Sequence, residues 1–419
     1  MSGSSERKVN ETVKNLNQKA SNHNKSNYNK SRDTIQSEQK KQEVLVGDLS
    51  TKFRLHQQCH HLQKLLTVER LLPAPLAEYS SFPLREALRL FGSVVTWIPL
   101  VHIRSLPYWI KDWQNLLRIY PEKNCILQIH GRAEDFREFH KHLSYIEDLV
   151  KSFPNTVIAL DINAGCPMPK IAGKGSGAGL LRNLNELEEV VKIVMDNTSL
   201  PVTVKCRIGF ENWQFDKIAE ILIKTRPAMV CVHTRLAVEK YSGSASRRWH
   251  LVKTYFKAMK KEGIVTCING DITDTATFLR ALAEAGSDLA AVGRAQISTP
   301  AAIAQISGRL PNKLPIWFEA ASLVLFLILT VNYFVRTESS RNEKVTNTQR
   351  ALSFFKRFVW SAFKGARGVK GFRRELAKLD WSKISYLIEL IFSFVKTNYG
   401  QEEYNRMIEY LSKVTREFT

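Results

Sequence analysis

The chain is poor in acidic residues and in cysteine, and each shortage excludes some classes of protein. Its 419 residues include 40 Asp and Glu against 61 Lys and Arg, which gives a formal net charge of +21. The six cysteines form no CxxC pair, which argues against a secreted disulfide framework and fits a reduced, intracellular compartment. No metal site is predicted. An excess of basic residues of this size is typical of proteins that meet a polyanion, either nucleic acid or an anionic membrane.

Residues 1–43 contain little that could form a core. Seven of them are apolar, and these are scattered through a segment rich in Asn, Lys and Ser. Such a segment cannot bury enough surface to offset the entropy lost on ordering, so we expect a disordered, solvated tail. An arm that touches RNA nonspecifically is the alternative. The segment has no apolar run, so a secretory signal is not expected. Residues 44–68 are expected to form a linker or a leading helix.

From about residue 69, short apolar runs alternate with amphipathic stretches. Eight candidate strands cover residues 70–73, 94–99, 125–128, 156–161, 202–205, 229–233, 265–269 and 289–292. Helical patterns between them include residues 82–91, 136–150, 184–195, 213–225, 249–261 and 275–285. Regular alternation of strand and helix predicts an α/β fold with a parallel sheet. Eight such units favour a closed (β/α)8 TIM barrel over residues 69–312, rather than an open doubly wound sheet.

The most apolar stretch of the chain is residues 316–335. A membrane span needs about 20 mainly apolar residues, and here Glu319 and Asn332 interrupt the run. A buried helix is therefore the main interpretation, and a transmembrane segment is the alternative. We predict that residues 313–419 form a smaller, all-helical C-terminal domain.

This C-terminal part carries a dense group of basic residues, opposed within 23 residues only by Glu375. They are Lys356, Arg357, Lys364, Arg367, Lys370, Arg373, Arg374 and Lys378. Phe354, Phe355, Phe358, Trp360, Phe363 and Phe372 lie between them. A charge run is usually a solvated surface, but basic residues this dense and mixed with aromatics are typical of contacts to phosphates and bases. We therefore predict RNA contact in this segment.

Polar residues follow the candidate strands, where a TIM barrel has its active site. After the fourth strand, Cys166 stands between Gly165 and Pro167 in a loop that also contains Asn163. A thiol held in a loop suits nucleophilic, acid or redox chemistry, although a partly buried loop cysteine is an equal alternative from residue types alone. The fifth strand ends with Lys205 and Arg207.

The last three strands also end in polar or glycine residues. These are His233, Arg235, Asn269, Gly270, Asp271, Gly293 and Arg294. Glycine N–H groups followed by arginine after the last two strands are the usual phosphate site of this fold. Each short motif is weak evidence for an active site when taken alone. Five consecutive strands that all end in polar residues are much less probable by chance than one.

These residues carry a resemblance to the tRNA-dihydrouridine synthases, flavin enzymes that reduce uridine in tRNA. The central block resembles the family's signature: Asp161-Ile-Asn163-Ala-Gly-Cys166-Pro167 with Lys170 and the loop of Gly175, Gly177 and Gly179. Ala74-Pro75-Leu76, Gln128-Ile-His-Gly131 and the motifs around Lys205, His233, Asn269 and Gly293 follow the family's order. The resemblance covers roughly residues 69–310. The basic segment 350–390 resembles, more loosely, the family's helical tRNA-binding extension.

The resemblance implies FMN as the cofactor. The residues implied to bind it are Pro75, Leu76, Ala77, Gln128, Lys205, His233, Asn269, Gly270, Asp271, Gly293 and Arg294. It also implies hydride transfer from flavin N5 to carbon 6 of uracil, with Cys166 donating a proton to carbon 5. Such a thiol must be protonated when it acts, so a depressed thiol pKa would not help. NADPH would reduce the flavin again, and it would bind transiently because the chain shows no dinucleotide fingerprint.

The resemblance implies tRNA as the partner, with its target base unstacked or flipped to reach the flavin. The implied substrate contacts are Asn163, Arg207, Arg235, Lys356, Arg357, Lys364, Arg367, Lys370, Arg373 and Arg374. No stable protein partner or membrane is implied. We expect a monomer in the cytoplasm, with an organelle as the alternative compartment.

Two other functions compete with this interpretation. One is a catalytically idle relative kept as an RNA-binding or assembly factor, which the presence of Cys166, Lys205 and His233 argues against. The other is a flavin barrel that acts on a small pyrimidine. That function would leave unexplained the balance of 17 basic against 9 acidic residues in 336–419.

Overall fold

The computed structural model describes residues 59–311, 313–337, 347–360, 362–363, 365–381 and 383–417. The described residues fall into two compact units that divide between Lys313 and Leu314. The tail predicted for residues 1–43 lies outside the described residues. The division of the chain into domains with separate roles stays a prediction.

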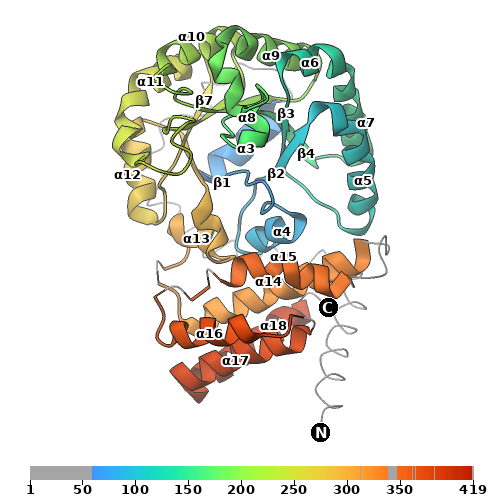
Figure 1. Ribbon diagram of the computed structural model, residues 1–419, viewed down its shortest axis with the longest axis vertical. Helices are drawn as coiled ribbons and strands as arrows, with labels where there is room; N and C mark the ends of the chain where they lie inside the picture. The colour runs from blue at the N-terminus through green and yellow to red at the C-terminus, as the bar shows by residue number, and fades with distance from the viewer. Residues whose placement is uncertain are drawn as a thin grey trace. The chain divides into compact units, whose positions relative to one another are not determined.

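The first unit contains a curled sheet of eight parallel strands with helices between them (Figure 1). The strands are β1 (Leu71–Pro73), β2 (Thr96–His102), β3 (Cys125–His130), β4 (Val157–Ala164), β5 (Val202–Arg207), β6 (Met229–His233), β7 (Val265–Asn269) and β8 (Leu289–Val292). They pair in the order β1-β8-β7-β6-β5-β4-β3-β2. This arrangement confirms the predicted TIM-barrel fold.

Within the described residues no strand ladder joins β1 to β2, and a buried carboxylate bridges the two instead. Glu69 precedes β1, and its Oε2 accepts hydrogen bonds from the backbone N–H groups of Val94 and Val95, both at 2.8 Å. Burial raises the pKa of Glu69 to about 7. One side chain therefore links the two strands at the ends of the sheet.

The helices of this unit alternate with the strands. They are α3 (Cys59–Val68), α4 (Phe82–Leu90), α5 (Leu106–Ile119), α6 (Ala133–Phe139), α7 (Ser144–Ser152), α8 (Pro169–Ala172), α9 (Leu184–Asp196), α10 (Phe215–Thr225), α11 (Lys253–Lys261), α12 (Thr275–Ala285) and α13 (Ala302–Ile306). The single helix predicted over 136–150 is wrong, because a 3-10 turn over His140–Leu143 separates α6 from α7. Helix α5 was not predicted, although its buried Leu106, Ile110, Trp113 and Leu117 have helical spacing.

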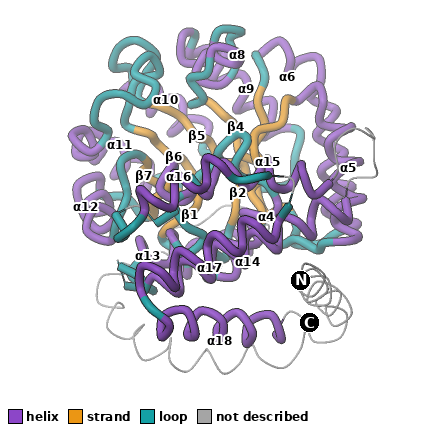
Figure 2. The backbone as a smooth tube through the Cα atoms, turned by 60° about the horizontal axis from the view of Figure 1, so that its bottom comes forward, coloured by secondary structure: helices purple, strands orange, loops and turns teal. Residues whose placement is uncertain are grey.

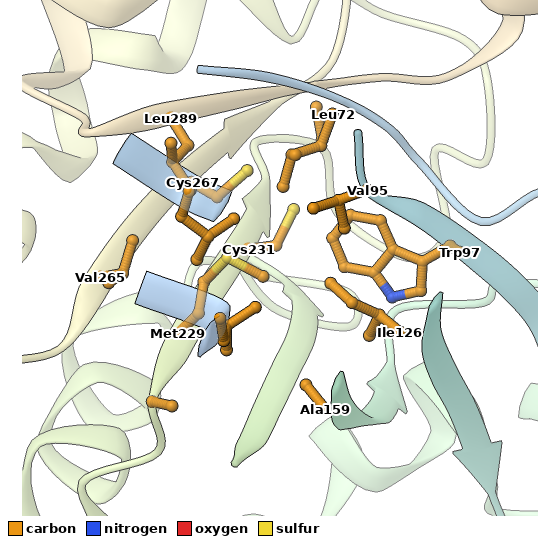
Figure 3. Packing of buried hydrophobic residues seen from close by; sticks show 14 of the residues in the cluster. Leu72, Val95, Trp97, Ile126, Ala159, Met229, Cys231, Val265, Cys267 and Leu289 are labelled. Carbon is orange, nitrogen blue, oxygen red and sulfur yellow. The ribbon is translucent and has the colours of Figure 1, made fainter. Parts of the chain in front are cut away.

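The core of the barrel is a cluster of apolar side chains from the strands and from residues just before them (Figure 3). Leu72, Met229 and Leu289 belong to it, and so do Leu62 and Leu66 from α3. Helix α3 therefore packs against the amino-terminal end of the barrel and leaves the carboxyl end to the loops. Cys206, Cys231 and Cys267 are fully buried, as expected for small apolar residues of the barrel.

The second unit is helical. Its described helices are α14 (Ile316–Thr337), α15 (Asn347–Val359), α16 (Val369–Lys378), α17 (Ile384–Tyr399) and α18 (Gln401–Glu417) (Figure 2). Aromatic rings form much of its core: Phe326 meets Phe358 edge-on at 4.8 Å, and Phe363 lies 4.6 Å from Phe394 between ring centres. The predicted helical C-terminal region is confirmed.

Helix α14 contains the apolar stretch noted in the sequence. Residues 316–336 are long and apolar enough to cross a membrane, with a mean hydropathy of 1.9. However, α14 packs on α15, α17 and α18, and its Ala320, Ala321 and Leu327 are fully buried. The carboxylate of Glu319 accepts a hydrogen bond from the backbone N–H of Phe363 at 3.3 Å. These contacts are those of a core helix, and the expected absence of a membrane stays a prediction.

Candidate functional site

The loop that carries Cys166 leaves the carboxyl end of β4 and is held on both sides. The Asn163 Oδ1 atom accepts hydrogen bonds from the backbone N–H of Gly165 at 3.1 Å and of Cys166 at 2.9 Å. The carbonyl of Cys166 accepts a bond from the N–H of Ala178 at 3.0 Å. Burial raises the pKa of the Cys166 thiol, so the thiol is protonated at neutral pH. This is the protonation state that a proton donor needs.

The glycine-rich loop after α8 packs directly against Cys166. Gly177 has a φ of +58°, and a Cβ placed on it would lie 3.0 Å from the Cys166 carbonyl oxygen and 2.8 Å from Ile171 Cγ2. Only glycine meets both demands without strain, because it tolerates positive φ and has no side chain. The close packing fixes the backbone of Cys166.

A buried hydrogen-bond network lies behind this loop. Gln128 on β3 donates from Nε2 to Asp161 Oδ2 at 2.6 Å, and its Oε1 accepts a bond from Asn163 Nδ2 at 2.9 Å. The other Asp161 oxygen accepts a bond from the Thr203 hydroxyl at 2.6 Å. Burial raises the pKa of Asp161 to about 6. The network connects β3, β4 and β5 to the Cys166 loop, so Gln128 already has a structural role besides the FMN contact predicted for it.

No role was predicted for Thr203. The sequence feature that points to it is a threonine between Val202 and Val204, opposite Asp161 in the register of β4 and β5. A polar group at such a position needs a hydrogen-bond partner, so the pair could have been suspected once the strands were aligned.

Lys205 on β5 and Asn269 on β7 meet above the core. Lys205 Nζ donates to Asn269 Oδ1 at 3.3 Å, while Asn269 Nδ2 donates to the carbonyl of Ala291 at 2.6 Å. The second bond orients the amide so that its oxygen faces the lysine. Lys205 is half-buried and forms no ion pair with any described residue. A cation of this kind is suited to an anionic or polarisable group.

The Arg207 guanidinium is buried and ties two loops together. Its Nε donates to the carbonyl of Gly165 at 2.9 Å, and its Nη atoms donate to the carbonyls of Leu236 at 2.7 Å and Lys240 at 2.9 Å. The structure thus places Arg207 behind the Cys166 loop as a support. The substrate contact assigned to it stays a prediction.

Arg235, His233 and Asp271 form a second group, in which Arg235 is buried and the other two are half-buried. Arg235 Nη2 donates to Asp271 Oδ1 at 2.6 Å, and Nη1 lies 3.3 Å from His233 Nε2. The second Asp271 oxygen accepts a bond from the N–H of Ala245 at 2.6 Å. Burial, with the neighbouring cations, lowers the pKa of His233 well below its ordinary value, so its imidazole is neutral. The carboxylate of Asp271 thus accepts hydrogen bonds from the loop after β6. Its contact with FMN stays a prediction.

Two glycines shape the space after β7 and β8. A Cβ on Gly270 would lie 2.6 Å from Ala245 Cβ and 2.9 Å from the His233 ring, so the backbone approaches both closely. A Cβ on Gly293 would meet nothing within 4 Å. The backbone at the end of β8 therefore faces open space, next to the exposed Arg294. Such a position admits a phosphate group.

The segment Pro75, Leu76 and Ala77 leaves β1 beside this space. Gln296 Nε2 donates to the carbonyls of Ala74 and Val292, both at 2.8 Å, and joins the ends of β1 and β8. Pro75 and Leu76 are half-buried and Ala77 is exposed. The residues predicted to line a flavin and those predicted to hold its phosphate thus lie at adjacent strand ends. Gln296 was not predicted, and its signal was a polar residue just after an apolar strand.

In the second unit, most of the predicted basic residues lie on the surface. Lys356, Arg357, Arg367, Lys370 and Arg374 are exposed and Arg373 is half-buried, while Lys364 lies outside the described residues. Most of the aromatic residues between them do not lie on this surface. Phe355, Phe358, Phe363 and Phe372 are buried in the helical core, so of this group only Trp360 is exposed to stack on a base. The predicted RNA contact now depends on charge.

The chain is similar to a set of proteins with one described activity. A family model for dihydrouridine synthase (Dus) matches residues 72–388. A probable tRNA-dihydrouridine synthase of Helicobacter pylori is 32% identical over 248 residues, which cover 58% of this chain and 72% of the relative. Probable tRNA-dihydrouridine synthase 1 of Synechocystis sp. is 26% identical over 350 residues, covering 80% of this chain and 84% of the relative. A solved histamine dehydrogenase from Rhizobium sp. 4-9 covers 62% of this chain and 49% of its own, at 10% identity and a TM-score of 0.43, which is too low to add to these matches.

Proposed function

Since the chain belongs to the dihydrouridine synthase family, we propose that it is an FMN-dependent enzyme that reduces a uridine in tRNA to 5,6-dihydrouridine. The observation that carries this proposal is the setting of Cys166. Its loop lies at the carboxyl end of the barrel, is held by Asn163, and presents a protonated thiol. Lys205 and Asn269 meet at the same end of the barrel.

The residues at this end of the barrel fit FMN. Lys205 is a half-buried cation whose Nζ donates to Asn269 Oδ1 at 3.3 Å, and a cation in this place suits negative charge on a reduced flavin ring. The open space at Gly293, with the exposed Arg294 beside it, suits the phosphate. His233, Asn269 and Gly270 would line the path between these two ends. When bound, FMN would supply the hydride for carbon 6 of uracil.

The protein's own contribution is to hold and deliver a proton. Cys166 donates its thiol proton to carbon 5 of the uracil as carbon 6 receives the hydride, which completes the addition of two hydrogens across the double bond. Burial keeps the thiol protonated until then. The Asn163 and Ala178 bonds fix the backbone from which the thiol projects. Solvent would return the proton to the thiolate, and NADPH would supply the reducing equivalents for the cofactor.

The enzyme works as a cytoplasmic monomer. The basic surface of its second unit binds the part of the tRNA that surrounds the target base. Exposed Arg367, Lys370 and Arg374 lie within eight residues of one another on or next to α16. Exposed cations in such a row neutralise phosphates without reading sequence. Specificity for the uridine then depends on how the barrel places the base.

The test is reduction of tRNA from a strain without dihydrouridine, with NADPH and purified protein carrying FMN. Cys166→Ala should keep its flavin and tRNA affinity but lose about 10²- to 10⁴-fold in rate, the usual contribution of a general acid. Cys231→Ala, which removes a thiol from the barrel core, is the matched control and should keep the rate. Protein that binds tRNA but neither binds flavin nor reduces uridine would instead support the idle RNA-binding alternative. A normal rate in Cys166→Ala would remove the proton-donor role.

A further inference from the structure

The segment that leaves β1 carries the residues predicted to line the flavin, Pro75, Leu76 and Ala77. Strand β1 is three residues long, and within the described residues no strand ladder joins it to β2. The turn after β1 closes on itself, because the Leu76 N–H donates to the Ser80 hydroxyl and the Ser80 N–H donates to the Leu76 carbonyl, both at 2.9 Å. Ser80 is buried. The position of this segment therefore depends on what holds Ser80.

Arg85, in the first turn of α4, holds Ser80 from outside this turn. Its Nη1 donates to the Ser80 carbonyl at 2.6 Å, while its Nε and Nη2 donate to the two carboxylate oxygens of Glu122 at 2.5 and 2.8 Å. Glu122 lies just before β3 and accepts a further bond from Arg89 Nη1 at 2.9 Å. One guanidinium thus connects the loop after β1 to the segment before β3.

The Arg85 and Glu122 side chains are both buried, with exposed fractions of 6% and 0%. Burial by itself would raise the pKa of Glu122, but the guanidinium groups of Arg85 and Arg89 outweigh it and lower the pKa to about 2. The pair is therefore charged at neutral pH. A buried ion pair is weak evidence for stability, because the cost of removing both charges from water offsets much of their attraction. A planar guanidinium, with donors in fixed directions, is suited instead to holding a carbonyl and a carboxylate in one geometry.

We propose that Arg85, held by Glu122, is a positioning residue for FMN, which acts through Ser80 on the backbone that lines the flavin ring. The inference rests on the proposed function, since it takes FMN as the cofactor. A segment that is already ordered loses less entropy when the flavin binds. It also holds the ring in one place relative to the Cys166 loop, as hydride and proton transfer require.

The experiment measures how fast FMN leaves the loaded, full-length protein after dilution, from the rise in flavin fluorescence. Ser80→Ala removes the acceptor of the Leu76 N–H and leaves the buried ion pair in place. It should release FMN about 2- to 10-fold faster, the factor that one hydrogen bond contributes. In Arg85→Lys the ammonium cannot hold both Glu122 oxygens and the Ser80 carbonyl at once, so release should be about 10- to 100-fold faster. The circular dichroism of the bound flavin should change in both variants, because it reports how the ring is held.

The matched controls lie at the amino end of the same barrel. Ser287→Ala removes a buried hydroxyl that donates to the carbonyls of Thr266 at 3.0 Å and Leu289 at 2.8 Å. Arg70→Lys removes a guanidinium whose Nε donates to the carbonyl of Asp288 at 3.2 Å. Both controls should lower the melting temperature and leave FMN release and the flavin circular dichroism unchanged.

Two results would overturn the positioning role of Arg85. One is wild-type FMN release and circular dichroism in Ser80→Ala and Arg85→Lys, and Ser80→Ala decides alone if Arg85→Lys does not fold. The other is an equal change in the controls at an equal loss of stability, which would show that FMN release follows overall stability. The measurement contains no tRNA. A wild type that holds FMN without reducing tRNA would therefore refute the proposed function and leave the role of Arg85 to be judged by its own variants.

Discussion

Replacing Arg207 with lysine should loosen two loops of the site at once. The guanidinium donates to three carbonyls, those of Gly165, Leu236 and Lys240, and a lysine ammonium in the same space can reach one of them. A hydrogen bond from a charged donor contributes about 1.5–3 kcal/mol, so the loss of two corresponds to about 3–6 kcal/mol. Backbone relaxation and entering water reduce this figure. Local opening of the loops should then become about 10²- to 10⁴-fold more frequent.

Native-state hydrogen exchange measures this opening directly. Peptides that cover residues 163–168 and 236–243 should exchange faster in Arg207→Lys, while peptides from helix α9 should not change. Arg226→Lys is the control, because Arg226 forms a mostly exposed ion pair with Glu262 at 2.6 Å, and such pairs contribute about 0–1 kcal/mol. If the two loops exchange at the same rate in Arg207→Lys as in the control, Arg207 does not support them.

Two further predictions concern pH and salt. Burial raises the pKa of Glu69 from 4.5 to about 7, so between these values the folded protein binds more protons than the unfolded chain. The free energy of unfolding should therefore fall by up to about 3 kcal/mol more in the wild type than in Glu69→Gln as pH rises through this window. Urea unfolding at each pH from 4.5 to 7 measures it, and an equal pH dependence in the two proteins would contradict the prediction. In the second unit, replacing Arg367, Lys370 and Arg374 with glutamine should weaken tRNA binding. It should also make the salt dependence flatter, because the negative slope of log K against log salt should shrink in magnitude by about 2–3. An unchanged slope would show that these cations do not meet phosphates.

The sequence predicted the barrel well and placed the loop that carries Cys166 at a strand end, because both depend on local patterns. The bounds of β6, β7 and β8 agree with the predicted runs, since short apolar β-prone segments end where glycine or charged residues begin. Gly165, Cys166 and Pro167 indicate a turn at a strand end by residue type alone, and all strand ends of a barrel converge on one face.

Other features depended on which groups the fold brings together. An arginine after a strand has the same sequence signature whether it meets a phosphate or a carbonyl, and the fold placed Arg207 and Arg235 on carbonyls and a carboxylate. The sequence places phenylalanines between the basic residues of the second unit, but a list of residue types does not say which of them face solvent. In the folded helices Phe355 and Phe358 are buried in the core, while Lys356 and Arg357 are exposed.

The sequence by itself thus determined the fold class, the family resemblance and the position of the Cys166 thiol at a strand end. The tertiary structure decided what surrounds that thiol: the Asp161–Gln128–Asn163 network and the shared guanidinium of Arg207. The physical reason is that these contacts join residues far apart in the chain. Their energies depend on burial and distance, which a local pattern of residue types does not contain.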